Sequence, residues 1–359
     1  MPRTASDPFL ERIATPYTAT LRVINMPVQV ESNQHGLLRL AQQAFDDYGA
    51  TELATVAPLH LRLIANTDFD AEALTQPPPV RVWSDGDLLV ASMTSADIGV
   101  CSFKARRAMI TVSPAMMAFP YHVRYELIEF ILYQLVSRSI GAVGIHVACV
   151  ADPRDAQGGV LLLLGESGAG KSTLAYACLT RGWRFLSEDG AFVVAADTVP
   201  VVGGKSRNVK VTIRGMPNFI HLNDGAQPLF PDAYQSQDAI WITRRSGRRK
   251  VEIDVRQAFP EAPRNEGMLD SLIFLTQQRG PQPTIRLLPV AQVRARLITL
   301  QPFAAAQVNW PEILPYLLAY PAYLLDAGSN PHSAVDLLGS VLPAIKTHFQ
   351  SRATEPLPS

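Results

Sequence analysis

The sequence has no excess of charge of either sign, because 32 Lys and Arg residues balance 32 Asp and Glu residues. A net charge near zero gives no overall attraction to nucleic acid or to an anionic membrane, so binding either would need a local patch. Cysteine is scarce and scattered, with only Cys101, Cys149 and Cys178. Three isolated thiols argue against a disulfide framework and against a zinc site.

Long apolar runs are also missing. Residues 128–136 and 159–164 are the most apolar stretches, and both are too short to span a bilayer. Residues 1–15 contain charges and two prolines instead of an apolar signal segment. These absences predict a cytoplasmic protein with neither a nucleic-acid nor a membrane partner.

The 359 residues, 47 % apolar and 18 % charged, provide ample material for a core and predict two domains. Residues 1–138 show short strands and two helical stretches, which indicate an α+β domain of unknown role. Residues 139–359 show an α/β pattern. Its five consecutive aliphatic residues, 160–164, predict a strand buried on both faces of a parallel sheet. Strands are also predicted over 145–150, 183–187, 191–195, 210–213, 251–255 and 271–276, and helices over 121–139, 170–180, 311–325 and 333–349.

A glycine-rich motif follows the buried strand and opens the helix over 170–180. Its glycines allow the backbone to curl so that several N–H groups face one phosphate chain, and the helix N-terminus adds partial positive charge. We therefore expect Lys171 to reach the β- and γ-phosphates of ATP, Ser172 to ligate Mg²⁺ and Thr173 to contact the α-phosphate. The alternative is an ordinary glycine-rich turn. The residues that match GxxxxGK[ST] are Gly165, Glu166, Ser167, Gly168, Ala169, Gly170, Lys171 and Ser172.

Two adjacent carboxylates, Glu188 and Asp189, come directly after the strand expected over 183–187. If this strand runs parallel to the one before the phosphate loop, its carboxyl end lies beside that loop. Glu188 and Asp189 are then candidates, with Ser172, to hold Mg²⁺ or to position a nucleophile. The alternative is an exposed acidic turn, since Asp-Gly is a common turn pair.

Three segments together resemble the catalytic core of the HPr kinase/phosphorylase family. They are His146, the run 159–172, and the run 181–189, which reads Arg-Gly-Trp-Arg-Phe-Leu-Ser-Glu-Asp. The resemblance covers residues 140–215, and more loosely extends to about residue 300. It implies a phosphoenolpyruvate carboxykinase-like P-loop core, binding of Mg²⁺ and ATP, and phosphate transfer to a serine hydroxyl.

The resemblance also implies roles for single residues. Asp189 stands where the family has its proton acceptor, and Glu188 stands at the first acidic position. His146 matches a histidine near the γ-phosphate. Arg214 matches the arginine of a later segment, 211–215, and would act on the transferring phosphoryl group. Without the resemblance, His146 would be interpreted as a histidine of the core. Arg214 could equally be a charge at the end of a strand or a residue that binds phosphate.

The sequence departs from the family at three points. The acidic pair is Glu-Asp instead of Asp-Asp, and Thr173-Leu174 follows Ser172 where the family has a glutamate. Thr212 replaces a metal-binding glutamate, so neither the dephosphorylating activity nor HPr as substrate is implied. Residues 1–135 do not resemble the family's N-terminal domain.

The leading hypothesis is an ATP-dependent kinase whose acceptor is a hydroxyl of a protein, peptide or small molecule. The resemblance further implies a homo-oligomer. Two alternatives remain: a P-loop ATPase without an acceptor, and a nucleotide-sensing relative without catalysis. The basic run 244–250 is predicted to be either a solvated hairpin loop or a loop that closes over phosphates. No role is predicted for His35, His60, His122, His221, His332 and His348.

Overall fold

The structure, a computed structural model, describes residues 10–45, 56–67, 73–154, 158–195, 210–235 and 239–341. Contacts between residues divide the chain into two compact units. Unit 1 comprises residues 1–140 and 244–247, and unit 2 comprises residues 141–243 and 248–359. The described residues form a mixed α/β structure with three sheets.

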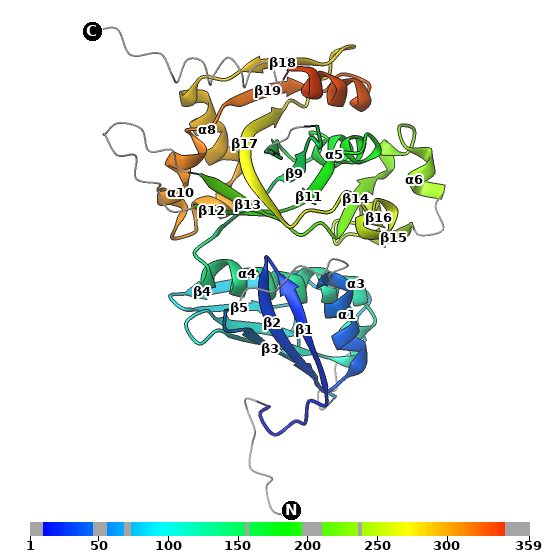
Figure 1. Ribbon diagram of the computed structural model, residues 1–359. Helices are drawn as coiled ribbons and strands as arrows, with labels where there is room; N and C mark the ends of the chain where they lie inside the picture. Colours follow the sequence, from blue (N-terminus) through cyan, green and yellow to red (C-terminus); the bar gives the residue numbers. More distant parts are fainter. Residues whose placement is uncertain are drawn as a thin grey trace, which may run out of the picture. The chain divides into compact units, whose positions relative to one another are not determined.

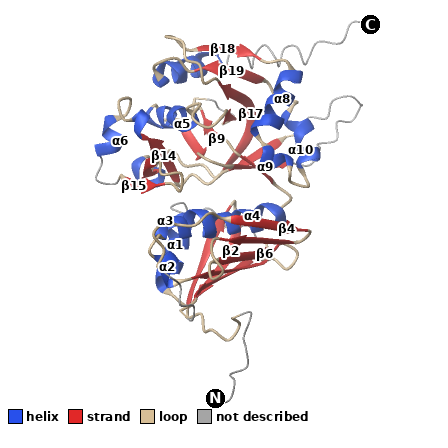
Figure 2. Cartoon of the chain, turned by 180° about the vertical axis from the view of Figure 1, so that it is seen from behind, coloured by secondary structure: helices blue, strands red, loops and turns tan. Residues whose placement is uncertain are grey.

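Unit 1 contains one seven-stranded sheet with helices on one of its faces (Figures 1 and 2). Its strands are β1 (Tyr17–Val23), β2 (Met26–Ser32), β3 (Leu59–Ala65), β4 (Arg81–Asp85), β5 (Leu88–Ser92), β6 (Ile98–Ser102) and β7 (Arg107–Val112). They lie in the order β1-β2-β3-β7-β6-β5-β4, with β2, β3 and β7 parallel. The helices are α1 (His35–Phe45), α2 (Pro114–Met117), α3 (Pro120–His122), the π-helix η1 (Val123–Glu129) and α4 (Phe130–Ser139).

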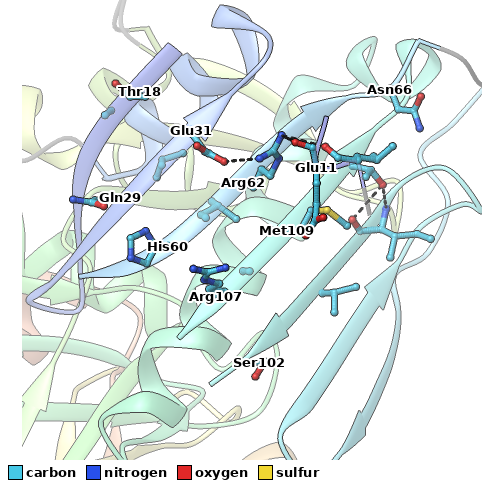
Figure 3. Close-up of a pocket in the computed structure, with 18 of the residues that line it drawn as sticks. Glu11, Thr18, Gln29, Glu31, His60, Arg62, Asn66, Ser102, Arg107 and Met109 are labelled. Carbon is cyan, nitrogen blue, oxygen red and sulfur yellow. Dashed lines mark hydrogen bonds and ion pairs between the residues drawn. The ribbon is translucent and has the colours of Figure 1, made fainter. Parts of the chain in front are cut away.

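The period-two pattern of the strands separates the two faces of this sheet. In β2, Val28 and Val30 are buried, whereas Gln29 between them is exposed. The polar side chains line a hollow of about 1330 Å³ on the sheet, drawn in Figure 3. There Arg62 donates to Glu31 at 3.0 Å and to the carbonyl of Leu10 at 3.1 Å, so this guanidinium is already engaged within unit 1.

Unit 2 is built around a nine-stranded sheet. Its strands are β8 (Val143–Ile145), β9 (Ala148–Ala151), β10 (Val160–Leu164), β11 (Arg184–Ser187), β12 (Ala191–Ala195), β13 (Val211–Arg214), β17 (Glu266–Leu275), β18 (Thr284–Leu287) and β19 (Ala322–Asp326). The order β11-β9-β10-β17-β13-β12-β8 forms one path, and β19 pairs with both β17 and β18. The helices are α5 (Lys171–Thr180), η2 (Asp224–Ala226), α6 (Pro231–Gln235), α7 (Val255–Ala258), α8 (Val290–Leu300), α9 (Pro302–Ala305) and α10 (Trp310–Leu317), and residues 331–341 are also helical.

Strand β10 is buried on both faces, as its run of aliphatic residues predicts. Leu161 and Leu163 belong to the core that packs with α5, while Leu162 and Leu164 belong to a second core with α8 and α10. Figure 1 shows α5 on one side of the central strands and α8 and α10 on the other. The sheet is mixed, however, because β10 is parallel to β17 and antiparallel to β9.

A separate three-stranded sheet lies in unit 2, in the order β14-β16-β15. It consists of β14 (Phe219–Asn223), β15 (Ile240–Thr243) and β16 (Arg249–Asp254). His221 in β14 stands directly opposite Glu252 in β16. The basic run 244–250 spans the turn between β15 and β16, which confirms its position in a hairpin.

Two sequence predictions about elements are wrong. The stretch 145–150 is two strands, β8 and β9, separated at His146 and Val147, so His146 lies in a loop and not within a strand. The helix predicted over 311–325 ends at Leu317, and residues 322–326 form β19, parallel to β17. A short apolar run fits the period of a helix as well as that of a strand. Here the pairing with β17 stabilises the strand. The prediction for 333–349 holds through residue 341, and the rest lies outside the described residues.

Candidate functional site

The glycine-rich motif predicted to bind phosphate forms the turn between β10 and α5, as its spacing predicts. Gly168 and Gly170 have φ angles of +86° and +93°, in the left-handed region that favours glycine. Gly170 is the N-cap of α5, and its carbonyl accepts the first helical bond, from Leu174 at 2.9 Å. The loop therefore turns directly into a helix N-terminus, where backbone N–H groups and the helix dipole favour an anion.

The side chain of Lys171 folds back over this loop. Its Nζ donates to the carbonyl of Gly165 at 2.8 Å and to that of Glu166 at 3.3 Å. Burial lowers the pKa of Lys171, while the nearby charges of Asp189 and Glu188 act in the opposite direction. The ammonium thus lies at the start of the loop, beside two carboxylates.

A second loop, between β17 and β18, holds the phosphate-binding motif from outside. Gln277 donates through Nε2 to Glu166 Oε2 at 2.8 Å, and Arg279 donates through Nη2 to the carbonyl of Ala169 at 3.2 Å. A Cβ at Gly170 would lie 2.1 Å from that Nη2, so any larger residue there would displace the Arg279 guanidinium, and the φ angle itself favours glycine. Nothing in the sequence motif indicates Gln277 or Arg279, because their contacts join residues that are 111 and 110 positions apart.

The acidic residue predicted to lie beside the loop does so. The hydroxyl of Ser172 donates to Glu188 Oε1 in a short hydrogen bond. Strand β9 lies between β10 and β11 and is antiparallel to both, so β10 and β11 run in the same direction and both end at this edge. Glu188 is only 5 % exposed, which makes the alternative of an exposed acidic turn wrong for this residue.

Glu188, His221 and Glu252 are in contact with one another below the surface, and we call these three residues the buried cluster. His221 Nδ1 lies 2.9 Å from Glu188 Oε2, and its Nε2 lies 2.9 Å from Glu252 Oε2. Each ring nitrogen is thus within hydrogen-bond distance of a different carboxylate, and the imidazole joins the two acids. The sequence predicts no role for His221 and gives no reason to single out Glu252. In the sequence, each of these two residues is a polar residue flanked by aliphatic residues. This pattern does not show which strands pair with each other.

The charge state of Glu188 reflects two opposing effects. Burial and the neighbouring charge of Asp189 raise its pKa, whereas the hydrogen bond and charge of His221 and the charge of Lys250 lower it. The balance leaves the pKa of Glu188 below its ordinary value. His221 therefore keeps a buried carboxylate ionised next to Ser172.

Asp189 has a different partner, and we call Asp189 and His146 the accessible pair. His146 Nδ1 donates to the backbone carbonyl of Asp189 at 3.0 Å and lies 3.3 Å from its Oδ1. The two side chains are 47 % and 38 % exposed. Gln301, which is buried, fixes the backbone of His146 by accepting from its N–H at 2.7 Å and donating to its carbonyl at 2.9 Å. Gln301 was also missed by the sequence analysis.

Two further predicted positions have contacts of their own. Arg214 Nε donates to Glu266 Oε2 at 3.1 Å, across the pair β13–β17, so its role on a phosphoryl group stays a prediction. The hydroxyl of Thr212 donates to the thioether of Met268 at 3.7 Å. Thr173, the predicted contact of the α-phosphate, lies in the first turn of α5.

The residues beside the loop suit Mg²⁺. This ion prefers one or two carboxylates, phosphate oxygens and water, and Ser172 with Glu188 provides two adjacent oxygen ligands. In the part of the chain that the structure describes, no group of three or more His, Cys, Asp and Glu residues could hold a metal ion by itself. A role of Asp189 in holding the metal stays a prediction. Across those same residues, no helix has the length and apolar character needed to span a membrane.

Comparisons with known proteins give little further guidance. No family model and no curated protein matches the chain. Among solved structures, the chain is similar to the Hpr(Ser) kinase/phosphatase from Coxiella burnetii at 13 % identity and a TM-score of 0.29. The match covers 59 % of this chain and 94 % of that chain. A similarity at this TM-score says nothing about activity. The proposal below therefore depends on the geometry of the site.

Proposed function

We propose that the protein is an ATP-dependent phosphotransferase that moves the γ-phosphate of ATP to a hydroxyl group, as an HPr kinase-like enzyme would. One observation carries the proposal. The phosphate-binding loop is in hydrogen-bond contact with a buried carboxylate at Ser172–Glu188, and an accessible carboxylate paired with histidine follows at once in the chain. This arrangement supports phosphate binding on one side and proton acceptance on the other.

The loop and Lys171 bind the triphosphate. Backbone N–H groups of Gly165–Ser172 face the phosphates, and the ammonium of Lys171 moves from the carbonyls of Gly165 and Glu166 to the β- and γ-phosphates. When bound through Ser172 and Glu188, Mg²⁺ supplies neutralisation of the phosphate charge. His221 and Glu252 hold Glu188 in the orientation that faces Ser172.

Asp189 accepts the proton of the acceptor hydroxyl. As the acceptor oxygen forms its bond to the γ-phosphorus, the bond between that phosphorus and the β–γ bridging oxygen breaks, and ADP leaves. The hydroxyl proton passes to the carboxylate of Asp189, which His146 orients from Nδ1. Arg214 is proposed to contribute positive charge, if it leaves Glu266 when substrates bind.

Incubation with γ-labelled ATP, Mg²⁺ and candidate hydroxyl acceptors tests the proposal. Label should move to an acceptor, and Asp189→Asn should lower the rate of transfer by about 10²–10⁴-fold while nucleotide binding persists. Release of labelled phosphate without any labelled acceptor would instead support an ATPase, and transfer by Asp189→Asn at a rate close to that of the wild type would exclude the proton-acceptor role.

A nucleotide-sensing protein without catalysis is a second candidate. Thr212 favours it, because the position of the family's metal-binding glutamate holds a hydroxyl bonded to Met268. Tight ATP binding in Mg²⁺ and in Mn²⁺, with no turnover of the labelled ATP, would support this second candidate.

A further inference from the structure

A cavity of about 640 Å³ adjoins the phosphate-binding loop in unit 2. Its walls come from the start of that loop, from the segment after β17, and from one face of α8. The α8 residues Gln292, Arg296 and Thr299 follow a spacing of four and three, which places them on one side of the helix. Val293 and Leu297 are buried on the neighbouring side of the helix and pack against the core.

One end of this cavity lies where the γ-phosphate is expected. Gly165 and Glu166 line it, and their carbonyls are the groups that Lys171 Nζ contacts at 2.8 and 3.3 Å. Since the lysine of this motif reaches the β- and γ-phosphates, the cavity opens at the reactive end of the triphosphate.

The C-terminal end of α8 connects this wall to His146 through the chain. Thr299 and Leu300 line the cavity, and Gln301, the next residue, bonds both backbone groups of His146. His146 in turn contacts Asp189. The cavity is therefore bordered by Gly165 and Glu166, whose carbonyls Lys171 contacts, and by Thr299 and Leu300, which directly precede the residue that holds His146.

The chemistry of the walls indicates what the cavity takes. Glutamine and threonine side chains supply hydrogen bonds, and Arg296 supplies a positive charge. The walls also carry one carboxylate, Glu166, whose Oε2 accepts a hydrogen bond from Gln277 at 2.8 Å. Arg296 is half-buried, and the described residues provide it with no ion pair. A half-buried guanidinium in that situation suits a carboxylate or another planar anion. The volume is that of a small-molecule site.

We propose that this cavity is the acceptor site, and that the acceptor is a small hydroxyl compound with one anionic group held by Arg296. The proposal rests on the phosphotransferase function proposed above and specifies its substrate class. The anion on Arg296 positions the hydroxyl between Lys171 and Asp189. A seryl side chain of a folded protein is the competing acceptor, which the test separates.

Matched pairs of hydroxyl compounds test this, with γ-labelled ATP and Mg²⁺: glycerate and glyceramide, L-serine and L-serinamide, N-acetyl-L-serine and its amide. In at least one pair, the acid should be phosphorylated at least about tenfold more efficiently than the amide, as expected for a charge-assisted hydrogen bond. Arg296→Ala should remove this preference through KM, with the Kd for MgATP unchanged. Arg294→Ala is the matched control, since Arg294 is exposed on the same helix and does not line the cavity.

Several results would overturn the assignment. One is equal phosphorylation of acid and amide, and another is phosphorylation of a seryl protein only. In Arg296→Ala, an unchanged KM or a raised Kd for MgATP as the sole effect would also overturn it. Titration of the same acids into protein loaded with a non-hydrolysable ATP analogue keeps the two proposals distinct. Acid binding that depends on Arg296 without any transfer contradicts the phosphotransferase alone. Transfer to other acceptors without acid binding contradicts the cavity assignment alone.

Discussion

Glu188 and Asp189 are neighbours in the sequence but lie in opposite surroundings. Glu188 is enclosed in the buried cluster, bonded to Ser172 and His221. Asp189 faces water for more than a third of its side chain and pairs with a half-exposed histidine. A shielded carboxylate that stays ionised suits a cation, whereas an accessible one suits exchange of a proton. These opposite surroundings predict different tasks for the two acids.

The largest expected effect comes from the accessible carboxylate. Asp189→Asn keeps the shape of the side chain and removes its basicity, so phosphate transfer should fall by about 10²–10⁴-fold. Steady-state rates measure this, and the Kd for ATP should stay close to that of the wild type. Asp336→Asn serves as the control, because Asp336 is a surface residue that pairs with Arg181. An Asp189→Asn rate within a factor of two of the control would remove the distinction between the two acids.

The buried cluster should dominate stability. His221→Ala leaves two buried carboxylates without their shared partner, which should lower the free energy of unfolding by about 3–5 kcal/mol. His146→Ala disrupts a half-exposed pair and should cost less than about 1 kcal/mol. Urea unfolding of both variants measures the difference. Equal losses in the two variants would mean that burial does not separate the clusters energetically.

The buried cluster should also set the requirement for metal. In His221→Gln the side-chain amide can donate to only one of the two carboxylates, so Glu188 loses its fixed orientation. The Mg²⁺ concentration for half-maximal transfer should rise by about 10–100-fold. Rates measured over a Mg²⁺ series give this value. His332→Gln, at a residue outside the cluster, should follow the wild-type curve.

The smallest expected effect is on acid stability. Because the pKa of Glu188 is lowered from its ordinary value of 4.5, the folded protein keeps this carboxylate ionised at pH values where the unfolded chain begins to protonate it. Its contribution to stability is complete above the unfolded value and is lost as the pH falls through the lowered one. Urea unfolding of the metal-free protein between about pH 6 and pH 3 should show this loss. Glu188→Gln should show a shallower dependence on pH.

The same comparison shows how far the sequence could predict the site. The phosphate loop, Lys171, Ser172 and Glu188 are local: a motif of fixed spacing between a strand and a helix, and an acid at the end of the next strand. Their relative placement follows from the order of the elements alone. The position of Asp189 can be predicted from the same features, because Asp189 directly follows Glu188 in the sequence.

His221, Glu252, Gln301 and Arg279 could not be predicted in the same way. Each acts through a contact between distant segments, such as the cross-strand position of His221 and Glu252 or the bond from Gln301 to His146 across 155 residues. Pairing of short strands depends on the whole packing of the unit, and a single sequence with apolar flanks does not specify it. The strand β19, predicted as a helix, shows the same limit.

The separate tasks of the two acids are tested most directly by one experiment, transfer of labelled phosphate as a function of Mg²⁺ concentration in Glu188→Gln and Asp189→Asn. Glu188→Gln should need far more Mg²⁺ but recover much of its maximal rate when the ion is in excess. Asp189→Asn should saturate at the wild-type Mg²⁺ concentration with its maximal rate still lost. The reverse pattern, with Asp189→Asn restored by excess Mg²⁺ and Glu188→Gln not restored, would contradict the account.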